Sequence, residues 1–281
     1  MAVLCLDLGG TKLLAALVEQ GRILASLQVP TSKDGQPGDW LDTLGEATVS
    51  WKGKYERIGA AVTGIVEDGK WSALNPATLA IPAGFELGAA IFDRFGLRPT
   101  LVNDAQAAAF GEYAAGAGGR EDMVFLTVST GLGGGMVLGG RLVSGSRGLA
   151  GHFGQTGRGS GAPLEDNVTG RWIASEALKA GHRMEAPGVF SAARDGNVWA
   201  QSIVDRSAAR VAALCVDIQL TIDPARIVIG GGIGLAEGYL AQVQSHLTNQ
   251  PEKYRPAVFP AALGVNAGVL GLEALIDIRN T

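Results

Sequence analysis

One pattern of strands and glycines occurs twice in this chain, about 120 residues apart. Each copy has a β-rich run, a polar loop rich in glycine, a second apolar run, a tight turn and a third strand. The first copy starts at residues 3–8 and the second at residues 124–128. Glycine makes up 42 of the 281 residues, about twice its usual share of roughly 7%. The duplication predicts two similar lobes, each opening with a hairpin.

Short predicted strands alternate with predicted helices along the rest of the chain, which is typical of α/β proteins. Further strands are predicted at residues 58–62, 100–102 and 226–229. Helices are predicted at residues 40–51, 84–95, 105–115, 169–180, 200–222, 235–247 and 266–278. We expect an N-terminal lobe of residues 1–103, completed by the terminal helix 266–281, and a second lobe of residues 104–265.

Composition excludes several classes of protein. The net charge is −4 without long basic runs, which argues against a nucleic-acid partner. No apolar run is long enough to cross a membrane, and the first residues lack the basic segment of a signal peptide. Cys5 and Cys215 sit in apolar runs, as small buried hydrophobes do in a reducing compartment. We therefore expect a cytoplasmic protein.

The first glycine loop offers groups that can bind an anion. Asp7 ends a strand, and Gly9, Gly10, Thr11 and Lys12 follow. Glycines let backbone N–H groups point at a phosphate, while the threonine and lysine side chains can donate to it. Asp7 could hold Mg²⁺ through water. The alternative is a glycine hairpin turn with a solvated lysine.

Residues 129–135 form the second predicted loop and could also hold phosphate through backbone N–H groups. Neither loop has the spacing of a P-loop. Residues 230–234 join a predicted strand to a predicted helix but lack the register of a dinucleotide-binding fingerprint. An alternative interpretation is that the backbone of residues 230–234 lies close to the base or ribose of a nucleotide.

Asn103 and Asp104 stand between a predicted strand and a predicted helix. Asn and Asp are favoured there as helix caps, but a carboxylate in that place can also accept a proton from an attacking hydroxyl. His152 lies among glycines, where it could reach a polar ligand, whereas His182 and His246 are predicted to lie on the surface. No metal-spaced cluster and no Ser/His/Asp arrangement is visible.

Together these features resemble the sugar kinases of the actin-like ATPase (ribonuclease H-like) fold. The resemblance is greater to the ROK family (repressors, open reading frames, kinases), and within it to bacterial N-acetylmannosamine kinases. The motifs that carry it are residues 7–13, 73–76, 103–108, 122–131, 148–152 and 234–240.

The resemblance implies an ATP- and Mg²⁺-dependent transfer to the 6-hydroxyl of an amino sugar, first of all N-acetylmannosamine. Glucose, N-acetylglucosamine or another hexose stays open as the acceptor, and a homodimer is common among relatives. A second alternative is a sugar-binding regulator. That branch carries an N-terminal helix-turn-helix, which we do not expect here because the first strand starts at residue 2. A sugar-binding relative with weak catalysis is a third.

The resemblance also implies a role for each matched residue. Asp104 would be the general base, and Asp7 would lie near Mg²⁺. The sugar-binding residues would be Gly64, Asn75, Asn103, His152 and Glu165. The residues on ATP would be Gly9, Gly10, Thr11 and Lys12 on one side of the phosphates, Thr130, Gly131 and Gly133 on the other, and Gly231 and Gly232 near the adenosine.

One departure from the family pattern is large. The family usually places a zinc-ligand His three residues after the position of His152, followed by a cysteine-rich loop. Here that place holds Gln155, and residues 157–163 form a shorter loop without cysteine. We therefore expect no zinc.

Overall fold

The computed structural model describes residues 1–74, 79 and 81–278. The chain divides into two compact units. Unit 1 comprises Met1–Ala115, Ser144–Ala150 and Val265–Thr281, and unit 2 comprises Gly116–Val143 and Gly151–Gly264. This division differs from the expected one chiefly at residues 104–115, which we had placed in the second lobe. They form helix α3 (Asp104–Ala115), which belongs to unit 1 because it packs against α9 (Ala267–Ile278).

A five-stranded mixed sheet forms the centre of unit 1, with the order β3-β2-β1-β4-β7. Strand β2 pairs antiparallel with β1 and β3, whereas β1, β4 and β7 run parallel. The strands are β1 (Ala2–Leu8), β2 (Lys12–Glu19), β3 (Arg22–Pro30), β4 (Tyr55–Val62) and β7 (Pro99–Asn103). A small hairpin is formed by β5 (Ile65–Glu67) and β6 (Lys70–Ser72).

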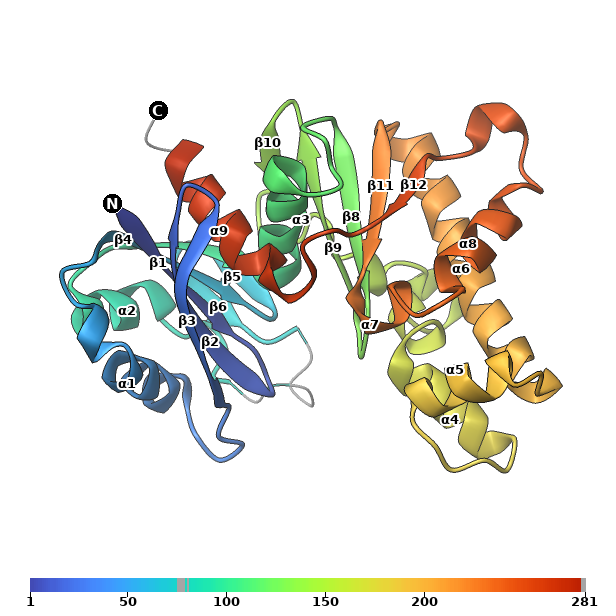
Figure 1. Ribbon diagram of the computed structural model, residues 1–281, viewed down its shortest axis with the longest axis horizontal. Coiled ribbons are helices and arrows are strands. Elements are labelled where there is room, and N and C mark those ends of the chain that lie inside the picture. Colours follow the sequence, from blue (N-terminus) through green and yellow to red (C-terminus); the bar gives the residue numbers. More distant parts are fainter. Residues whose placement is uncertain (75–78, 80, 279–281) are drawn as a thin grey trace. The chain divides into compact units, whose positions relative to one another are not determined.

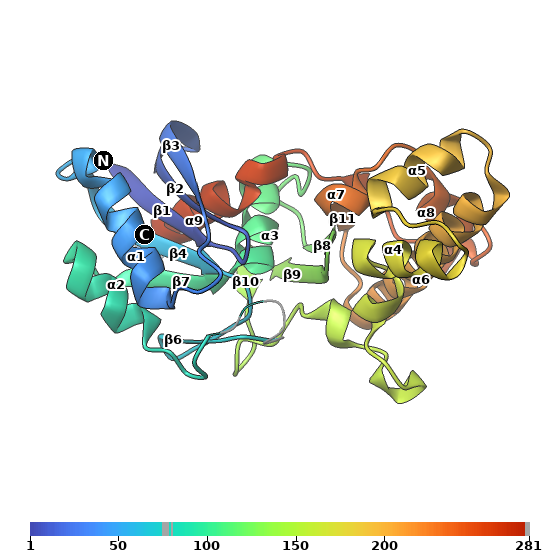
Figure 2. The same cartoon turned by 90° about the horizontal axis from the view of Figure 1, so that it is seen from below.

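Helices cover both faces of the unit 1 sheet (Figure 2). Leu4, Leu6 and Leu8 of β1 share a core with α1 (Pro37–Ala47) and α2 (Leu87–Phe95). On the opposite face, a Cβ on Gly59 of β4 would lie 2.9 Å from the side chain of Ile276 in α9. Burial on both faces explains why the central strands read as unbroken apolar runs in the sequence.

Helices α3 and α9 touch backbone to backbone. A Cβ on Gly271 would overlap the carbonyl oxygen of Ala107, and one on Gly111 would overlap that of Ala267. Such close approach is possible only because glycine has no side chain. The contact fixes the position of α3, whose first residue is Asp104.

The sheet of unit 2 repeats the strand order of unit 1, as β10-β9-β8-β11-β12 (Figure 1). Its strands are β8 (Met123–Val128), β9 (Leu132–Leu138), β10 (Arg141–Val143), β11 (Arg226–Gly230) and β12 (Val258–Pro260). Strand β9 is antiparallel to β8 and β10, and β8, β11 and β12 are parallel. The duplication read from the sequence is thus a duplication of sheet topology.

The helices of unit 2 pack a large apolar core against one face of this sheet. They are α4 (Gly170–Lys179), α5 (Ala186–Arg194), α6 (Val198–Ile222) and α8 (Tyr239–Leu247). A short helix, α7 (Gly231–Gly234), follows β11. The 3-10 helices of the two units are η1 (Val49–Trp51), η2 (Phe153–Gln155), η3 (Arg158–Ser160), η4 (Leu164–Asn167), η5 (Glu252–Tyr254) and η6 (Gly264–Asn266).

Several sequence predictions are wrong in detail. The predicted loop 129–135 is a turn of only three residues, because β9 already begins at Leu132. The helix predicted from residue 235 begins at Tyr239, because Gly238 has a positive φ of 80° and interrupts it. Strand β12 and helix α5 were not predicted, since neither segment has a long periodic pattern.

Cys5 and Cys215 are buried free thiols, as expected. Over residues 1–74, 79 and 81–278, no helix combines the length and apolar character that crossing a bilayer would require.

We predict that Gly271→Ala lowers the free energy of unfolding by about 1–3 kcal/mol, because its Cβ would push α9 away from α3. Gly45→Ala in the middle of α1 is the matched control. Its Cβ would come no closer than 4.0 Å to a neighbour, so better helix propensity should stabilise the protein by about 0.5–1 kcal/mol. Urea denaturation of both variants measures this; equal effects would contradict the assigned contact.

Candidate functional site

The loop between β1 and β2 is a tight hairpin turn held by Thr31, the residue that follows β3. The Gly9 N–H donates to the Lys12 carbonyl (3.2 Å), and the Thr31 hydroxyl donates to the Gly9 carbonyl (2.7 Å). The Thr31 N–H donates to the Thr11 carbonyl (3.1 Å). Gly9 and Gly10 are half-buried, whereas Thr11 and Lys12 are exposed. The loop is therefore braced from behind and presents a hydroxyl and an ammonium group outward.

Asp7 lies at the end of β1, just before this loop, with its side chain half-buried. Burial, and after it the charge of Asp104, raise the pKa of Asp7, and the charge of Lys12 lowers it; together they bring the pKa to about 7. The negative charge of Asp104 therefore opposes ionisation of Asp7, and a nearby cation would relieve that repulsion. Oxygen donors of this kind suit Mg²⁺.

The Asp104 carboxylate is fixed at both oxygens. The Thr63 hydroxyl donates to Oδ2 (2.8 Å), and the Ala105 N–H donates to Oδ1 (2.8 Å). Asp104 is the first residue of α3, so its carboxylate lies at the positive end of the helix dipole. The geometry is that of a carboxylate held in one rotamer.

Asn103 is a buried helix cap. Its Oδ1 accepts N–H groups of Ala105 (3.0 Å) and Gln106 (3.1 Å), and its Nδ2 donates to the Gly64 carbonyl (2.8 Å). Gly64 has φ +118°, and a Cβ there would overlap the Ser72 carbonyl oxygen. Both residues therefore fix backbone around Asp104. Asn75, the other predicted sugar ligand of unit 1, lies outside the described residues.

Residues 144–150 pack onto α3 and β5. Buried Gln106 donates from Nε2 to the Ala150 carbonyl (2.8 Å). Gly148 has φ +70°, and a Cβ there would overlap the Val66 carbonyl oxygen. This contact places the segment that leads to His152.

In unit 2, three backbone segments meet at the carboxyl end of β8: the turn at residues 129–131, the start of α4 and the start of α7. The Gly170 N–H at the start of α4 donates to the Ser129 carbonyl (2.8 Å), and the Arg171 Nε donates to the Thr130 carbonyl (3.1 Å). Gly231 has φ +85°, and a Cβ there would overlap the Val128 carbonyl oxygen, whereas Gly232 faces open space. The carboxyl ends of parallel strands are where α/β sheets bind ligands.

Gly133 lies within β9, where it pairs with Thr127. The nearby glycines serve packing: a Cβ on Gly134 would lie 2.6 Å from the Phe125 carbonyl oxygen, and one on Gly154 would overlap the Leu132 carbonyl oxygen. The glycines after Gly131 therefore allow η2 to pack on β9, and only residues 129–131 form the turn.

Glu165 lies beside this turn, with its side chain 13% exposed. A Cβ on Gly131 would be 3.3 Å from Glu165 Oε2. The Gln155 Nε2 donates to Glu165 Oε1 (2.6 Å). His152 is half-buried and immediately precedes η2. The structure thus brings Glu165 next to the predicted phosphate turn of unit 2.

The other histidines take no part in either group of residues. His182 stacks on Trp199 with ring centroids 3.9 Å apart, and His246 pairs with Asp205 (2.7 Å). Among the residues that the structure describes, no three His, Cys, Asp or Glu side chains gather in a way that could hold a metal ion. Gln155, at the place of the family's zinc-ligand His, binds a carboxylate instead.

Sequence reasoning missed four side chains that position the site: Thr31, Thr63, Gln106 and Arg171. Thr63 precedes Gly64, and Gln106 lies in the motif 103–108 that was used for the resemblance. No local signal marks Thr31 or Arg171, because their partners are distant in the sequence.

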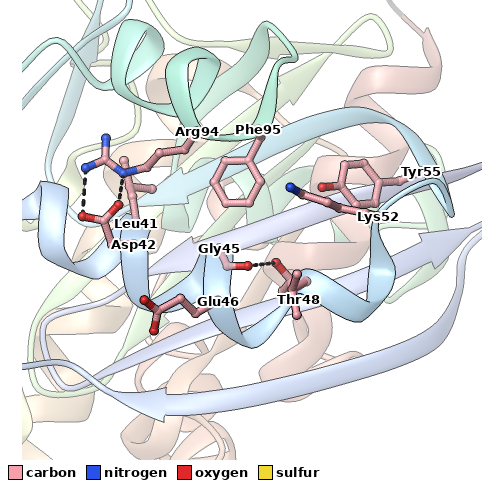
Figure 3. Close-up of a pocket in the computed structure, with 10 residues that line it drawn as sticks. Leu41, Asp42, Gly45, Glu46, Thr48, Lys52, Tyr55, Arg94 and Phe95 are labelled. Atoms are coloured by element: carbon pink, nitrogen blue, oxygen red, sulfur yellow. Dashed lines mark hydrogen bonds and ion pairs between the residues drawn. The ribbon is translucent and has the colours of Figure 1, made fainter.

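A separate hollow of about 310 Å³ lies over α1, η1 and α2 of unit 1 (Figure 3). It contains the ion pair between Arg94 and Asp42 (2.6 Å), with Lys52, Tyr55 and Phe95 along its wall. No predicted site residue lines it.

The family model described as "ROK family" matches residues 3–278. The chain belongs to the ROK family. It has the two mixed α/β lobes of the actin-like ATPase fold, as the sequence predicted. In the ROK family glucokinase from Streptomyces griseus, solved in complex with glucose and AMPPNP, the similarity has a TM-score of 0.82 at 27% identity and covers 100% of both chains.

Curated relatives are more similar in sequence. A bifunctional enzyme NanE/NanK from Brucella melitensis is 44% identical over 276 residues, which is 97% of this chain and 53% of the relative. The chain thus spans about half the length of that protein. An N-acetylmannosamine kinase from Citrobacter koseri is 41% identical over 285 residues, and the match covers 98% of both chains.

We predict that Asp7→Asn stabilises the protein increasingly as pH rises from 5 to 8. The raised pKa means that the fold favours the protonated acid. The stability that protonated Asp7 contributes to the fold is complete below pH 3.8, the pKa of Asp7 in the unfolded chain. That stability is lost as the pH rises through about 7, its pKa in the folded protein. The amide avoids this loss, which amounts to at most about 4 kcal/mol. Melting temperatures in chelator without nucleotide test this; parallel pH profiles of the two proteins would contradict it.

Proposed function

We propose that this protein transfers the γ-phosphoryl group of ATP to the 6-hydroxyl of N-acetylmannosamine. The observation that carries the proposal is the fixed carboxylate of Asp104, held by Thr63 and by the start of α3. Its support from similarity is the 41% identity, over nearly all of both chains, to a protein named N-acetylmannosamine kinase. We place the reaction in the cytoplasm, where ATP is available and free thiols persist.

Asp104 acts as the general base in this proposal. The 6-hydroxyl of the sugar gives its proton to the carboxylate as its oxygen attacks the γ-phosphorus. The hydrogen bonds from Thr63 and Ala105 hold the carboxylate in one orientation. Orientation matters because phosphoryl transfer gains most of its rate from positioning and charge stabilisation.

Asp7 is the residue that fits Mg²⁺. Its carboxylate is half-buried and close enough to Asp104 for each charge to oppose the other, so a cation would relieve the repulsion. When bound with ATP, Mg²⁺ neutralises charge that develops on the phosphate oxygens. Gly10, Thr11 and Lys12 contribute N–H, hydroxyl and ammonium donors to the phosphates, and Gly9, whose N–H donates to the Lys12 carbonyl, closes the turn that presents them.

In unit 2, Thr130 and Gly131 contribute donors to the phosphates, and Gly231 and Gly232 border the nucleoside. The support is their position at the carboxyl ends of β8 and β11, together with the nucleotide analogue AMPPNP in the S. griseus glucokinase. Gly133 pairs with Thr127 within the β8–β9 ladder, so in this proposal it supports the turn only by its place in β9.

His152, Glu165, Gly64 and Asn75 bind the sugar in this proposal, as the resemblance to the family implies. Glu165 is supported by its low exposure and its fixed carboxylate. We assign Asn103 to a supporting role, because both of its polar atoms already bind backbone groups. It holds Gly64 and the first turn of α3 in place.

We predict that Asp104→Asn lowers kcat by about 10²–10⁴-fold, since the amide cannot accept the proton. The KM for the sugar should change little, because the amide keeps the shape and can still bind a hydroxyl. Asp93→Asn, at an exposed position of α2, is the control and should retain wild-type kcat. A mutant that kept more than a tenth of kcat would assign the base to another residue.

We also predict that kcat/KM is highest for N-acetylmannosamine when ATP-dependent turnover is measured with a panel that includes N-acetylglucosamine, glucose and mannose. Calorimetry with each sugar accompanies the assay. A higher kcat/KM for glucose would make glucose the acceptor in place of N-acetylmannosamine and would leave the proposed kinase activity standing. Sugar binding without any turnover would favour a sugar-binding regulator or a relative with weak catalysis.

A further inference from the structure

Glu165 is held by a chain of side chains from three neighbouring segments of unit 2. Gln155 of η2 donates from Nε2 to Glu165 Oε1 (2.6 Å), and Arg158 of η3 donates to Gln155 Oε1. On the other side, Arg171 of α4 has Nη2 4.0 Å from Glu165 Oε2. The amide of Gln155 therefore links a cation on one side to the carboxylate on the other.

The backbone around this chain is tightly closed. The Leu164 N–H donates to the Thr156 carbonyl (2.9 Å), which ties the start of η4 to the end of η2. A Cβ on Gly154 would overlap the Leu132 carbonyl oxygen and would lie 3.2 Å from the Glu165 Cβ. Gln155 and Glu165 therefore belong to one packed piece of structure.

The hydrogen bond from Gln155 sets the orientation of the Glu165 carboxylate. Arg158 and Arg171 are both substantially exposed, and pairs of exposed charges hold geometry weakly. The neutral amide of Gln155 gives a directed hydrogen bond to one oxygen of the largely buried Glu165 side chain. That bond leaves Oε2 beside Gly131 and Arg171.

This arrangement occupies the place where the family pattern expects a zinc ligand. The residues present do not fit zinc, because Gln155 donates its amide to a carboxylate and the described residues offer no group of metal ligands. We propose that Gln155 is a positioning residue. Its amide orients Glu165 to bind the sugar, and it does so without a metal, at the place where the family pattern has a zinc ligand. The proposal rests on the proposed sugar-kinase function.

The first test is Gln155→Met, which keeps the length of the side chain and removes the amide. The KM and the calorimetric Kd for N-acetylmannosamine should rise about tenfold, while kcat changes less than threefold and the KM for ATP stays constant. Thr156→Val is the matched control from the same segment, since its hydroxyl contacts only the Phe153 carbonyl in the contacts described. Equal sugar affinities of wild type and Gln155→Met would overturn the proposal.

The second test is Gln155→Glu, whose effect should depend on pH. Above pH 7 two carboxylates would repel each other, so sugar affinity should fall at least as far as in Gln155→Met. Near pH 5.5 one shared proton restores the hydrogen bond, and affinity should recover at least threefold relative to wild type at the same pH. Arg158 and Arg171 stay charged throughout, and the parallel wild-type profile accounts for His152. A pH-independent loss would indicate a merely structural role and overturn the proposal.

Binding and turnover separate the two hypotheses. If the wild type binds sugar without phosphorylating it, the proposed kinase function fails, while the Kd series still tests Gln155. If no sugar binds, both fail. Near one zinc per chain in untagged protein, with sugar affinity lost on chelation, would overturn the metal-free positioning directly.

Discussion

The backbone contact between α3 and α9 is the constraint on which the site in unit 1 depends. Helix α3 carries Asp104 at its first residue, and its position is set by Gly111 and Gly271, where the two helices meet without intervening side chains. Helix α9 in turn packs on the sheet through Ile276 against Gly59. Any displacement of α9 is therefore transmitted to the carboxylate that the proposed reaction uses.

Glycine serves the same purpose in unit 2, where η2 packs directly on β9. Gly134 and Gly154 remove the side chains that would keep these segments apart. The consequence is that Gln155 and Glu165 lie against the turn at Thr130 and Gly131. Most of the glycines that look like a phosphate loop in the sequence therefore bring backbone segments together, and few of them remain to face a ligand.

The two units hold their carboxylates in opposite ways. Asp7 and Asp104 are close enough to repel each other, and burial raises the pKa of Asp7 further. Ionisation of Asp7 therefore costs stability, and the Mg²⁺ proposed for this site would reduce that cost. Glu165 lies between an amide and a guanidinium group, which suits the role proposed for it, to accept hydrogen bonds from sugar hydroxyls.

The sequence by itself determined the duplicated strand order, the family and the short segments that carry Asp7, Asp104 and Glu165. These features depend on local patterns: apolar runs of strand length, glycine turns and a strand that ends in Asn-Asp. Only the tertiary structure decided which side chains support them. Thr31, Thr63 and Gln155 act on partners 10 to 41 residues away, and the α3–α9 contact joins two helices that are far apart in the sequence. Such pairings follow from how the elements pack, and no local spacing encodes them, which is why the same glycines read as loops in the sequence and are strand and helix contacts in the fold.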